Sequence, residues 1–197
     1  LNLRLGRLKD EGRAGFRQVS LANVTVTSAA SDAVLVNPDP DFAKSWYSIA
    51  LTAGLPVISD AVVIDGWTQP GFSDSPMIEI NGASVPVGID GFEIAAGNST
   101  VRGLVINQFD AAGIFLHAGG DNLIVGNYIG ADPSGLIDRG NNADGVSIES
   151  DGNIVGGDSV AERNIISGNN DNGVIINLGA SGNRILGNYI GLGADGS

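Results

Sequence analysis

The 197 residues are 43% hydrophobic and only 16% charged, with 30 glycines; this is too apolar for a disordered chain and typical of a turn-rich β protein. A formal net charge of −12 argues against nucleic acid as a partner, because phosphate binding requires clustered lysine and arginine. The absence of cysteine excludes disulfides and thiolate metal sites. No apolar run is long enough to cross a membrane, so membrane insertion is not expected.

Residues 1–45 are expected to form a cap in front of the repeats that occupy residues 46–197. The alternating segment AVLVN (33–37) predicts a strand, and the spacing of Phe16, Val19 and Asn23 favours a short helix. A cap is needed because the open end of a stack of parallel strands invites aggregation.

Three short apolar patterns then recur in a fixed order along the chain. In the third pattern the expected inward residues recur at every second position, and such a two-residue period is the mark of a strand with one buried face. The expected inward residues are, for the first pattern, Val101, Ile124, Val155 and Ile185; for the second, Ile80, Ile106, Ile129, Ile166 and Ile190; and for the third, Phe92, Ile114, Val146 and Val174.

The spacing between these patterns decides the architecture. Most gaps between consecutive patterns are between 5 and 12 residues, too short for helical crossovers between neighbouring parallel strands. Such gaps suit a coil that turns a corner after each strand and returns one level higher. The prediction is an all-β fold: a single right-handed parallel β-helix of roughly five rungs, with three strands in each rung.

Glycine and asparagine occupy equivalent positions at the expected corners. Gly103, Gly126, Gly157 and Gly187 all follow the first pattern, where a sharp corner requires a positive φ. Another column, which precedes the first pattern, contains Ser99, Asn122, Asn153 and Asn183. Stacked asparagines can bond from rung to rung. The phrase GNYIG, which occurs at 126–130 and again at 187–191, is therefore interpreted as architecture.

The segments VVIDGWTQPGF (62–72), STVRGLVINQF (99–109), GNYIGADPSG (126–135) and RNIISGNN (163–170), taken in order, resemble bacterial right-handed parallel β-helix repeat proteins. The segment GRAGFRQVSLANV (12–24) resembles, more faintly, a cap that precedes such helices. The resemblance implies a secreted or cell-surface protein. It also implies the pectate-lyase-like superfold, whose members include pectin-degrading lyases and hydrolases.

The chain stops after a copy of the second pattern, so the rung 183–191 has no partner strand or cap in this sequence. Either the natural protein continues, or another molecule covers this edge. Self-association through this last rung is therefore expected.

The sequence contains one pair of side chains that is a candidate for acid–base catalysis. His117, the only histidine, should stack over Glu149 on the outer face of the third strands. The pair could act on a polysaccharide, or it could be a surface contact between rungs. No two acids fall in one column of adjacent rungs, which disfavours the two-carboxylate hydrolases.

The segment 131–144 is the candidate cation site. Asp132, Asp138 and Asp144 could supply oxygen ligands for Ca²⁺. The alternative is that these residues only shape turns, since the segment lacks a calcium-loop spacing.

A candidate ligand groove lies on the corner between the first and second strands. Two long loops there, 65–77 and 157–163, should stand on either side of tight rungs and leave a saddle between them. Trp67, Phe72, Arg102 and Tyr128 would line this groove and bind a glycan. The alternative is that Trp67 folds onto the coil and fills the saddle.

The leading hypothesis is a non-catalytic, extracellular or cell-surface module that presents a side face to a carbohydrate or a protein. A polysaccharide lyase or glycoside hydrolase is the alternative, and a structural spacer is the third possibility. No cofactor is expected apart from the calcium ion.

Overall fold

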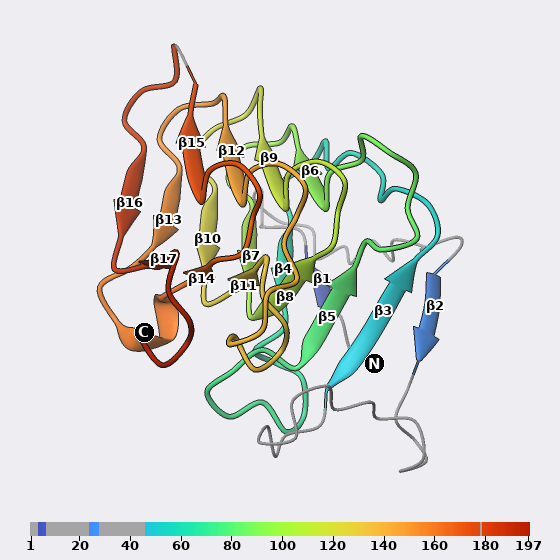
Figure 1. The fold of residues 1–197 in the computed structure, drawn as a ribbon. Coiled ribbons are helices and arrows are strands. Elements are labelled where there is room, and N and C mark those ends of the chain that lie inside the picture. Colours follow the sequence, from blue (N-terminus) through green and yellow to red (C-terminus); the bar gives the residue numbers. More distant parts are fainter. Residues whose placement is uncertain (1–3, 7–23, 28–45, 178) are drawn as a thin grey trace.

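The computed structural model describes residues 4–6, 24–27, 46–177 and 179–197, and it contains three sheets that wind around a common axis (Figure 1). Within these ranges the one helical element is the 3-10 turn η1 (Val160–Glu162). No helix in the described part of the chain is long and apolar enough to cross a membrane. The strand and the helix predicted within residues 1–45 lie outside these ranges.

Each sheet collects one strand type from successive rungs. The six-stranded sheet contains β1 (Arg4–Gly6), β4 (Val63–Asp65), β7 (Thr100–Arg102), β10 (Leu123–Val125), β13 (Ile154–Gly156) and β16 (Arg184–Leu186). The seven-stranded sheet contains β2 (Val24–Thr27), β3 (Tyr47–Leu51), β5 (Ile78–Asn81), β8 (Leu104–Asn107), β11 (Tyr128–Ile129), β14 (Ile165–Ile166) and β17 (Tyr189–Ile190). The four-stranded sheet contains β6 (Phe92–Ile94), β9 (Ile114–Leu116), β12 (Val146–Ile148) and β15 (Val174–Ile176).

The strands from β3 onward pair in parallel with the rungs above and below, so the predicted parallel β-helix is confirmed. The predicted inward columns are also in register: Val101 pairs with Ile124, and Ile106 pairs with Ile129. The inward side chains of the middle rungs are buried in one continuous apolar core. Burial of this stack is the main driving force for the fold.

The N-terminal segment contributes two antiparallel strands to the sheets. β1 pairs with β4, and β2 pairs with β3, each at the end of its sheet. These pairings occupy the outer edges of β4 and β3.

The tight corner between the six-stranded and seven-stranded sheets requires the left-handed backbone of glycine. Gly103, Gly126 and Gly187 have φ values of 69°, 63° and 60°. The prediction was wrong for the fourth member, Gly157, because the positive φ of 85° falls on Gly156 instead. The physical reason is the long connection 157–164, which starts its turn one residue earlier than the tight corners do.

Two buried asparagine ladders stabilise the corners on either side of the six-stranded sheet. In the predicted ladder, Asn153 Oδ1 accepts hydrogen bonds from both nitrogens of Asn122, at 3.0 and 2.9 Å. In the ladder of the GNYIG phrase, Asn164 Oδ1 accepts from both nitrogens of Asn127, at 2.9 and 3.1 Å. The side chains thereby satisfy backbone groups that the corners take out of the sheets.

All three sheets end at the same end of the molecule, with strands β15, β16 and β17 (Figure 1). Apolar side chains that would be buried in an inner rung are exposed at this end. They are Ile176, Ile190 and Leu192.

We predict that the 197-residue chain self-associates through this end, because pairing would cover both the apolar residues and the free strand edges. Light scattering across a dilution series should show a species larger than one chain. A strict monomer whose amides in residues 183–191 resist hydrogen exchange would contradict this prediction.

Candidate functional site

Three of the four residues predicted to line a groove do come together. The Arg102 guanidinium bonds the Asp65 carboxylate at 2.7 Å and lies 4.7 Å from the centre of the Trp67 ring. The Trp67 amide donates to Asp65 Oδ1 at 2.9 Å, and the Phe72 ring lies 6.4 Å from Trp67. The positive charge of Arg102 is therefore already paired with a carboxylate and an aromatic face.

Trp67 does not leave the saddle open. A Cβ atom added to Gly103 would lie 2.3 Å from Trp67 Cδ1, and one added to Gly126 would lie 2.8 Å from Trp67 Cζ2. The indole thus lies directly on the backbone of two successive tight corners. This arrangement agrees with the alternative in which the tryptophan covers the saddle.

The two repeated tyrosines, Tyr128 and Tyr189, have covering roles on the outer face of the seven-stranded sheet. The ring of Tyr128 lies beneath Gly135, at the tip of the loop that follows β11. The ring of Tyr189 packs against the Arg163 guanidinium at 4.0 Å. The Tyr128 ring therefore supports the loop that follows β11. Burial, assisted by the charge of Asp132, raises the pKa of the Tyr128 phenol.

The three aspartates of the predicted cation site are not gathered into one cluster. Asp132 is buried, whereas Asp138 is exposed and bonds the Gly140 amide at 2.8 Å. Asp144 is bonded by the side chain of Asn172 at 2.8 Å. Within the described ranges, no three His, Cys, Asp or Glu side chains are grouped closely enough to hold a metal ion.

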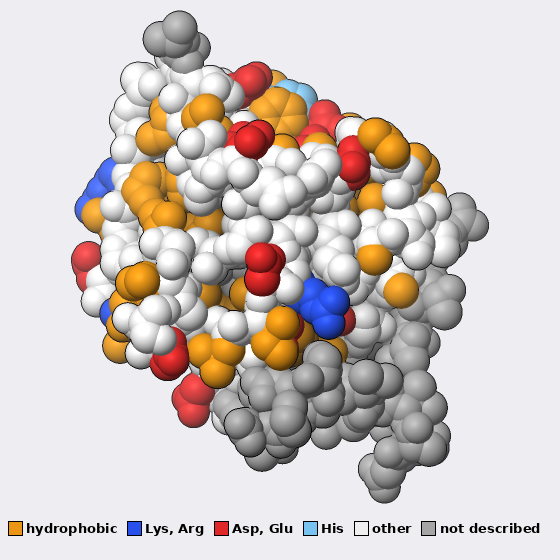
Figure 2. All heavy atoms as spheres, in the orientation of Figure 1, with side chains coloured by type: hydrophobic (Ala, Val, Ile, Leu, Met, Phe, Trp, Pro, Cys, Tyr) orange, Lys and Arg blue, Asp and Glu red, His pale blue; other side chains and the backbone are white. Residues whose placement is uncertain are grey.

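The outer face of the four-stranded sheet carries the chain's histidine beside an aromatic ring. His117 and Phe115 are stacked, with ring centres 4.7 Å apart and planes inclined by 21°. His117 Nε2 lies 2.9 Å from Glu93 Oε1, and all three side chains are partly exposed. Figure 2 shows the histidine, in pale blue at the upper edge of that view, between hydrophobic and acidic side chains.

The expected pairing of His117 with Glu149 is not formed, although the two residues directly follow the paired residues Leu116 and Ile148. His117 instead pairs with Glu93 of the preceding rung, and Glu149 accepts from Asn177 Nδ2 at 3.2 Å. Glu93 is directly opposite Phe115 in the ladder. A long side chain can reach its diagonal neighbour on the next strand.

Asp90 lies beside this group and bonds the Ala112 amide at 2.8 Å. Burial raises the pKa of the Asp90 carboxyl, and the negative charge of Glu93 raises it further; the Ala112 amide and His117 act in the opposite direction. Asp90 is therefore a carboxyl whose ionised form is disfavoured by its surroundings.

We predict that Asp90→Asn stabilises the fold near neutral pH, because asparagine retains an acceptor for the Ala112 amide and removes the disfavoured charge. A carboxyl whose pKa is raised on folding destabilises the folded state only when it is ionised. The advantage of the variant should thus shrink as the pH falls through the pKa of folded Asp90. Thermal melts at pH 7 and pH 4 test this, and an advantage that grows on acidification would contradict it.

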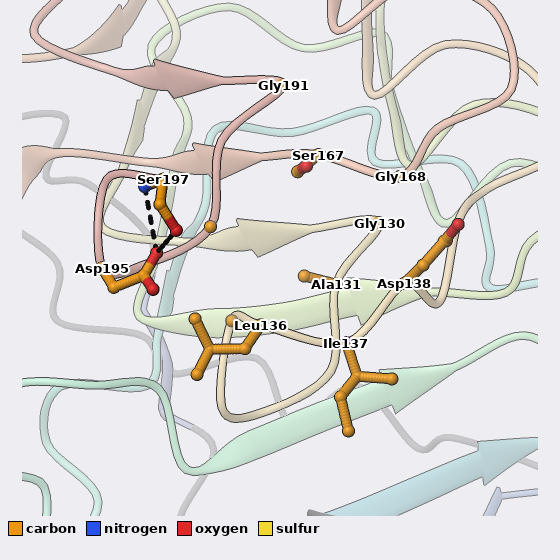
Figure 3. Close-up of a pocket in the computed structure, with 12 residues that line it drawn as sticks. Gly130, Ala131, Leu136, Ile137, Asp138, Ser167, Gly168, Gly191, Asp195 and Ser197 are labelled. Atoms are coloured by element: carbon orange, nitrogen blue, oxygen red, sulfur yellow. Dashed lines mark hydrogen bonds between the residues drawn. The ribbon is translucent and has the colours of Figure 1, made fainter.

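A hollow of about 420 Å³ lies between the two loops that follow the GNYIG phrases (Figure 3). Residues 131–138 form one wall and residues 191–197 form the other, while Ser167 and Gly168 of the intervening rung lie between them. The Ala194 amide donates to Gly135 O at 3.0 Å and ties the two loops together. The hollow exists because the rung of β14 carries only a short connection at this corner.

Most residues that line this hollow have small side chains, and the charged ones are acidic. Asp138 and Asp195 are its charged residues, and glycine backbone forms much of the remainder. Hydrogen bonds from the amide and hydroxyl of Ser197 lower the pKa of the Asp195 carboxyl. The hollow therefore suits a small neutral or cationic group rather than an anion.

The chain shows no match to a family model, to a curated protein or to a solved structure. The resemblance to bacterial β-helix repeat proteins accordingly stays a prediction.

Sequence reasoning missed the ion pair between Asp65 and Arg102. The signal was present, because these residues are at the same position in consecutive copies of the first strand and are directly opposite in the sheet. The Asp65 carboxylate also holds the turn that follows it, since it accepts a hydrogen bond from Trp67 N.

Proposed function

We propose that this chain is a non-catalytic binding module of a secreted or cell-surface protein, and that it presents the outer face of its four-stranded sheet to a carbohydrate. The observation that carries the proposal is the stacked, partly exposed pair Phe115 and His117 with Glu93 at 2.9 Å. The secreted or surface location rests on the resemblance of the repeats to bacterial β-helix proteins.

Sugar recognition needs an apolar ring face and a nearby polar group that orients the hydroxyls. Phe115 offers the first, and Glu93 with His117 offers the second. Phe115 and Glu93 belong to strands of the coil, and His117 directly follows β9, so little conformational entropy is lost on binding.

The charge of the module favours a neutral glycan over an acidic one. Residues 46–197 contain 17 aspartates and glutamates but only 4 arginines and no lysine. A polyanionic ligand would be repelled by this field, and most strongly at low salt.

The proposal is tested by a glycan array followed by titration calorimetry with the best neutral oligosaccharide. Phe115→Ala should weaken binding by about tenfold, which corresponds to ~1.4 kcal/mol, and Glu93→Gln should also weaken it. Val160→Ala, an exposed position on η1, is the control and should bind as the unaltered chain does. Equal affinities for the Phe115 variant and the unaltered chain would refute this face as the binding site.

A polysaccharide lyase or hydrolase is the second candidate, because burial raises the pKa of the Asp90 carboxyl, which is the direction that a general acid requires, and Asp90 interacts with Glu93 and His117. Assays with a panel of acidic and neutral polysaccharides would show shortened products if the module is an enzyme, and Asp90→Asn would abolish them. Binding without degradation supports the module. The absence of both would favour a protein ligand or a structural spacer.

A further inference from the structure

The connection after β11 folds back on itself as a hairpin over residues 131–138. Ala131 and Asp138 form an antiparallel bridge, and the Asp132 amide donates to Ile137 O at 2.9 Å. Asp132 is only 2% exposed. One of its oxygens, Oδ1, holds the turn together by accepting from the hydroxyl of Ser134 and from the amide of Ile137 at 3.2 Å.

The other oxygen of this carboxylate has no partner. Asp132 Oδ2 is inaccessible to solvent and receives no hydrogen bond. A second orphaned acceptor, Oδ1 of the fully buried Asn107, belongs to the strand β8.

The contacts of Asn107 place it at the base of this hairpin. Its Nδ2 donates to Ala131 O, the residue directly before Asp132, at 3.1 Å. The same nitrogen donates to Glu79 Oε1 at 2.9 Å, and the Glu79 side chain is itself buried. Asn107 thus joins the base of the hairpin to the seven-stranded sheet, and the buried residues Glu79, Asn107 and Asp132 follow one another along these contacts.

Both orphaned atoms are acceptors, so each lacks a partner that offers positive charge or a hydrogen-bond donor. Leaving a buried carboxylate oxygen without such a partner is costly. Among the described residues the ion pairs formed are Arg102 with Asp65 and His117 with Glu93, and neither involves Asp132.

We propose that a calcium ion binds beneath this hairpin, with Asp132 Oδ2 and Asn107 Oδ1 as its protein ligands and Glu79 as the supporting carboxylate. Hard divalent cations such as Ca²⁺ are bound by ligand sets that consist only of oxygen atoms. The site differs from the cluster expected from sequence, because it uses Asp132 but neither Asp138 nor Asp144. It is independent of the carbohydrate face on the four-stranded sheet.

Terbium, which replaces calcium and luminesces when a nearby tyrosine absorbs ultraviolet light, is the direct probe. Tyr128 is close enough to Asp132 for the two side chains to interact electrostatically. The chelator-treated 197-residue chain should therefore sensitise terbium, and calcium should displace the ion. Tyr128→Phe should reduce the luminescence but leave the calcium-induced rise in Tm unchanged.

Asp132→Asn retains the shape and the Oδ1 acceptor but removes the charge, and it should weaken terbium binding at least tenfold. The matched controls are Asp138→Asn and Asp144→Asn in the same segment, which should bind as the unaltered chain does. Calcium should also raise the Tm of the unaltered chain in proportion to the logarithm of its concentration above Kd.

The second measurement needs no variant and so does not depend on the folding of Asp132→Asn. A Tm that is unchanged by millimolar calcium would overturn the proposal and assign the space to water. Terbium binding that survives in Asp132→Asn but is lost in Asp138→Asn or Asp144→Asn would also overturn it.

Discussion

Replacing Ile129 by alanine should lower the free energy of unfolding by about 2–5 kcal/mol, the range for large-to-small changes in a close-packed core. Ile129 is 0% exposed and is stacked between Ile106 and Ile166 in the central column of the seven-stranded sheet. The rungs above and below are fixed by their own hydrogen bonds, so they cannot close around the cavity. Urea denaturation gives the difference directly.

The matched control is Ile190→Ala, because this isoleucine belongs to the same column at the end of the stack. It is 46% exposed and pairs with Ile166 on one side. At a protein concentration low enough to dissociate the chains, its replacement should cost about 1 kcal/mol or less, since little apolar surface is buried there in the single chain. At higher concentration the loss should grow as self-association covers the last rung, and an unmoved Tm for Ile129→Ala would contradict the packing of the column.

Asn164→Ala should be as damaging as the loss of a core side chain, although it removes only a polar group. Asn164 Oδ1 accepts from two nitrogens of Asn127, and its Nδ2 donates to Ile124 O at 2.8 Å. The variant removes the partner of the Asn127 amide and of Ile124 O, at about 1–3 kcal/mol each before any entry of water, whereas Asn127 Nδ2 retains Val101 O as its acceptor at 3.0 Å. We expect a loss of at least about 2 kcal/mol in the free energy of unfolding.

The control for this variant is Asn170→Ala. Asn170 also bonds the rung below, through Asn142 Oδ1 at 2.7 Å, but it does so on the exposed corner. Water replaces that bond, so its removal should change the stability by less than about 0.5 kcal/mol. Similar losses for Asn164 and Asn170 would mean that solvent reaches the buried ladder.

The repeated GNYIG phrase is chiefly architecture. Its first glycine turns the corner, its asparagine continues a buried ladder, and its isoleucine fills the core column. The two copies lie two rungs apart, and the loops that follow them meet across the rung between. The hollow in Figure 3 thus arises because a long loop follows each copy of the phrase, while the rung between the two copies has only a short connection.

The sequence alone determined the fold, the strand order and the inward columns. These follow from the two-residue alternation within each strand and from the short gaps between strands, both of which are local properties of the chain. The buried columns of Val101 and Ile124, and of Ile106 and Ile129, were predicted in their actual register. The first asparagine ladder was predicted for the same reason, because a solenoid repeats each position at every rung.

The tertiary structure decided what the long connections and the outward side chains do. Trp67 fills the saddle, Glu93 rather than Glu149 pairs with His117, and Asp132 turns inward beneath its own hairpin. A long outward side chain can reach several neighbouring residues, so its position in a column does not determine which of them it pairs with. A loop longer than the tight corner is not constrained by the rung period. Its conformation depends on which surface of the neighbouring rungs it can cover.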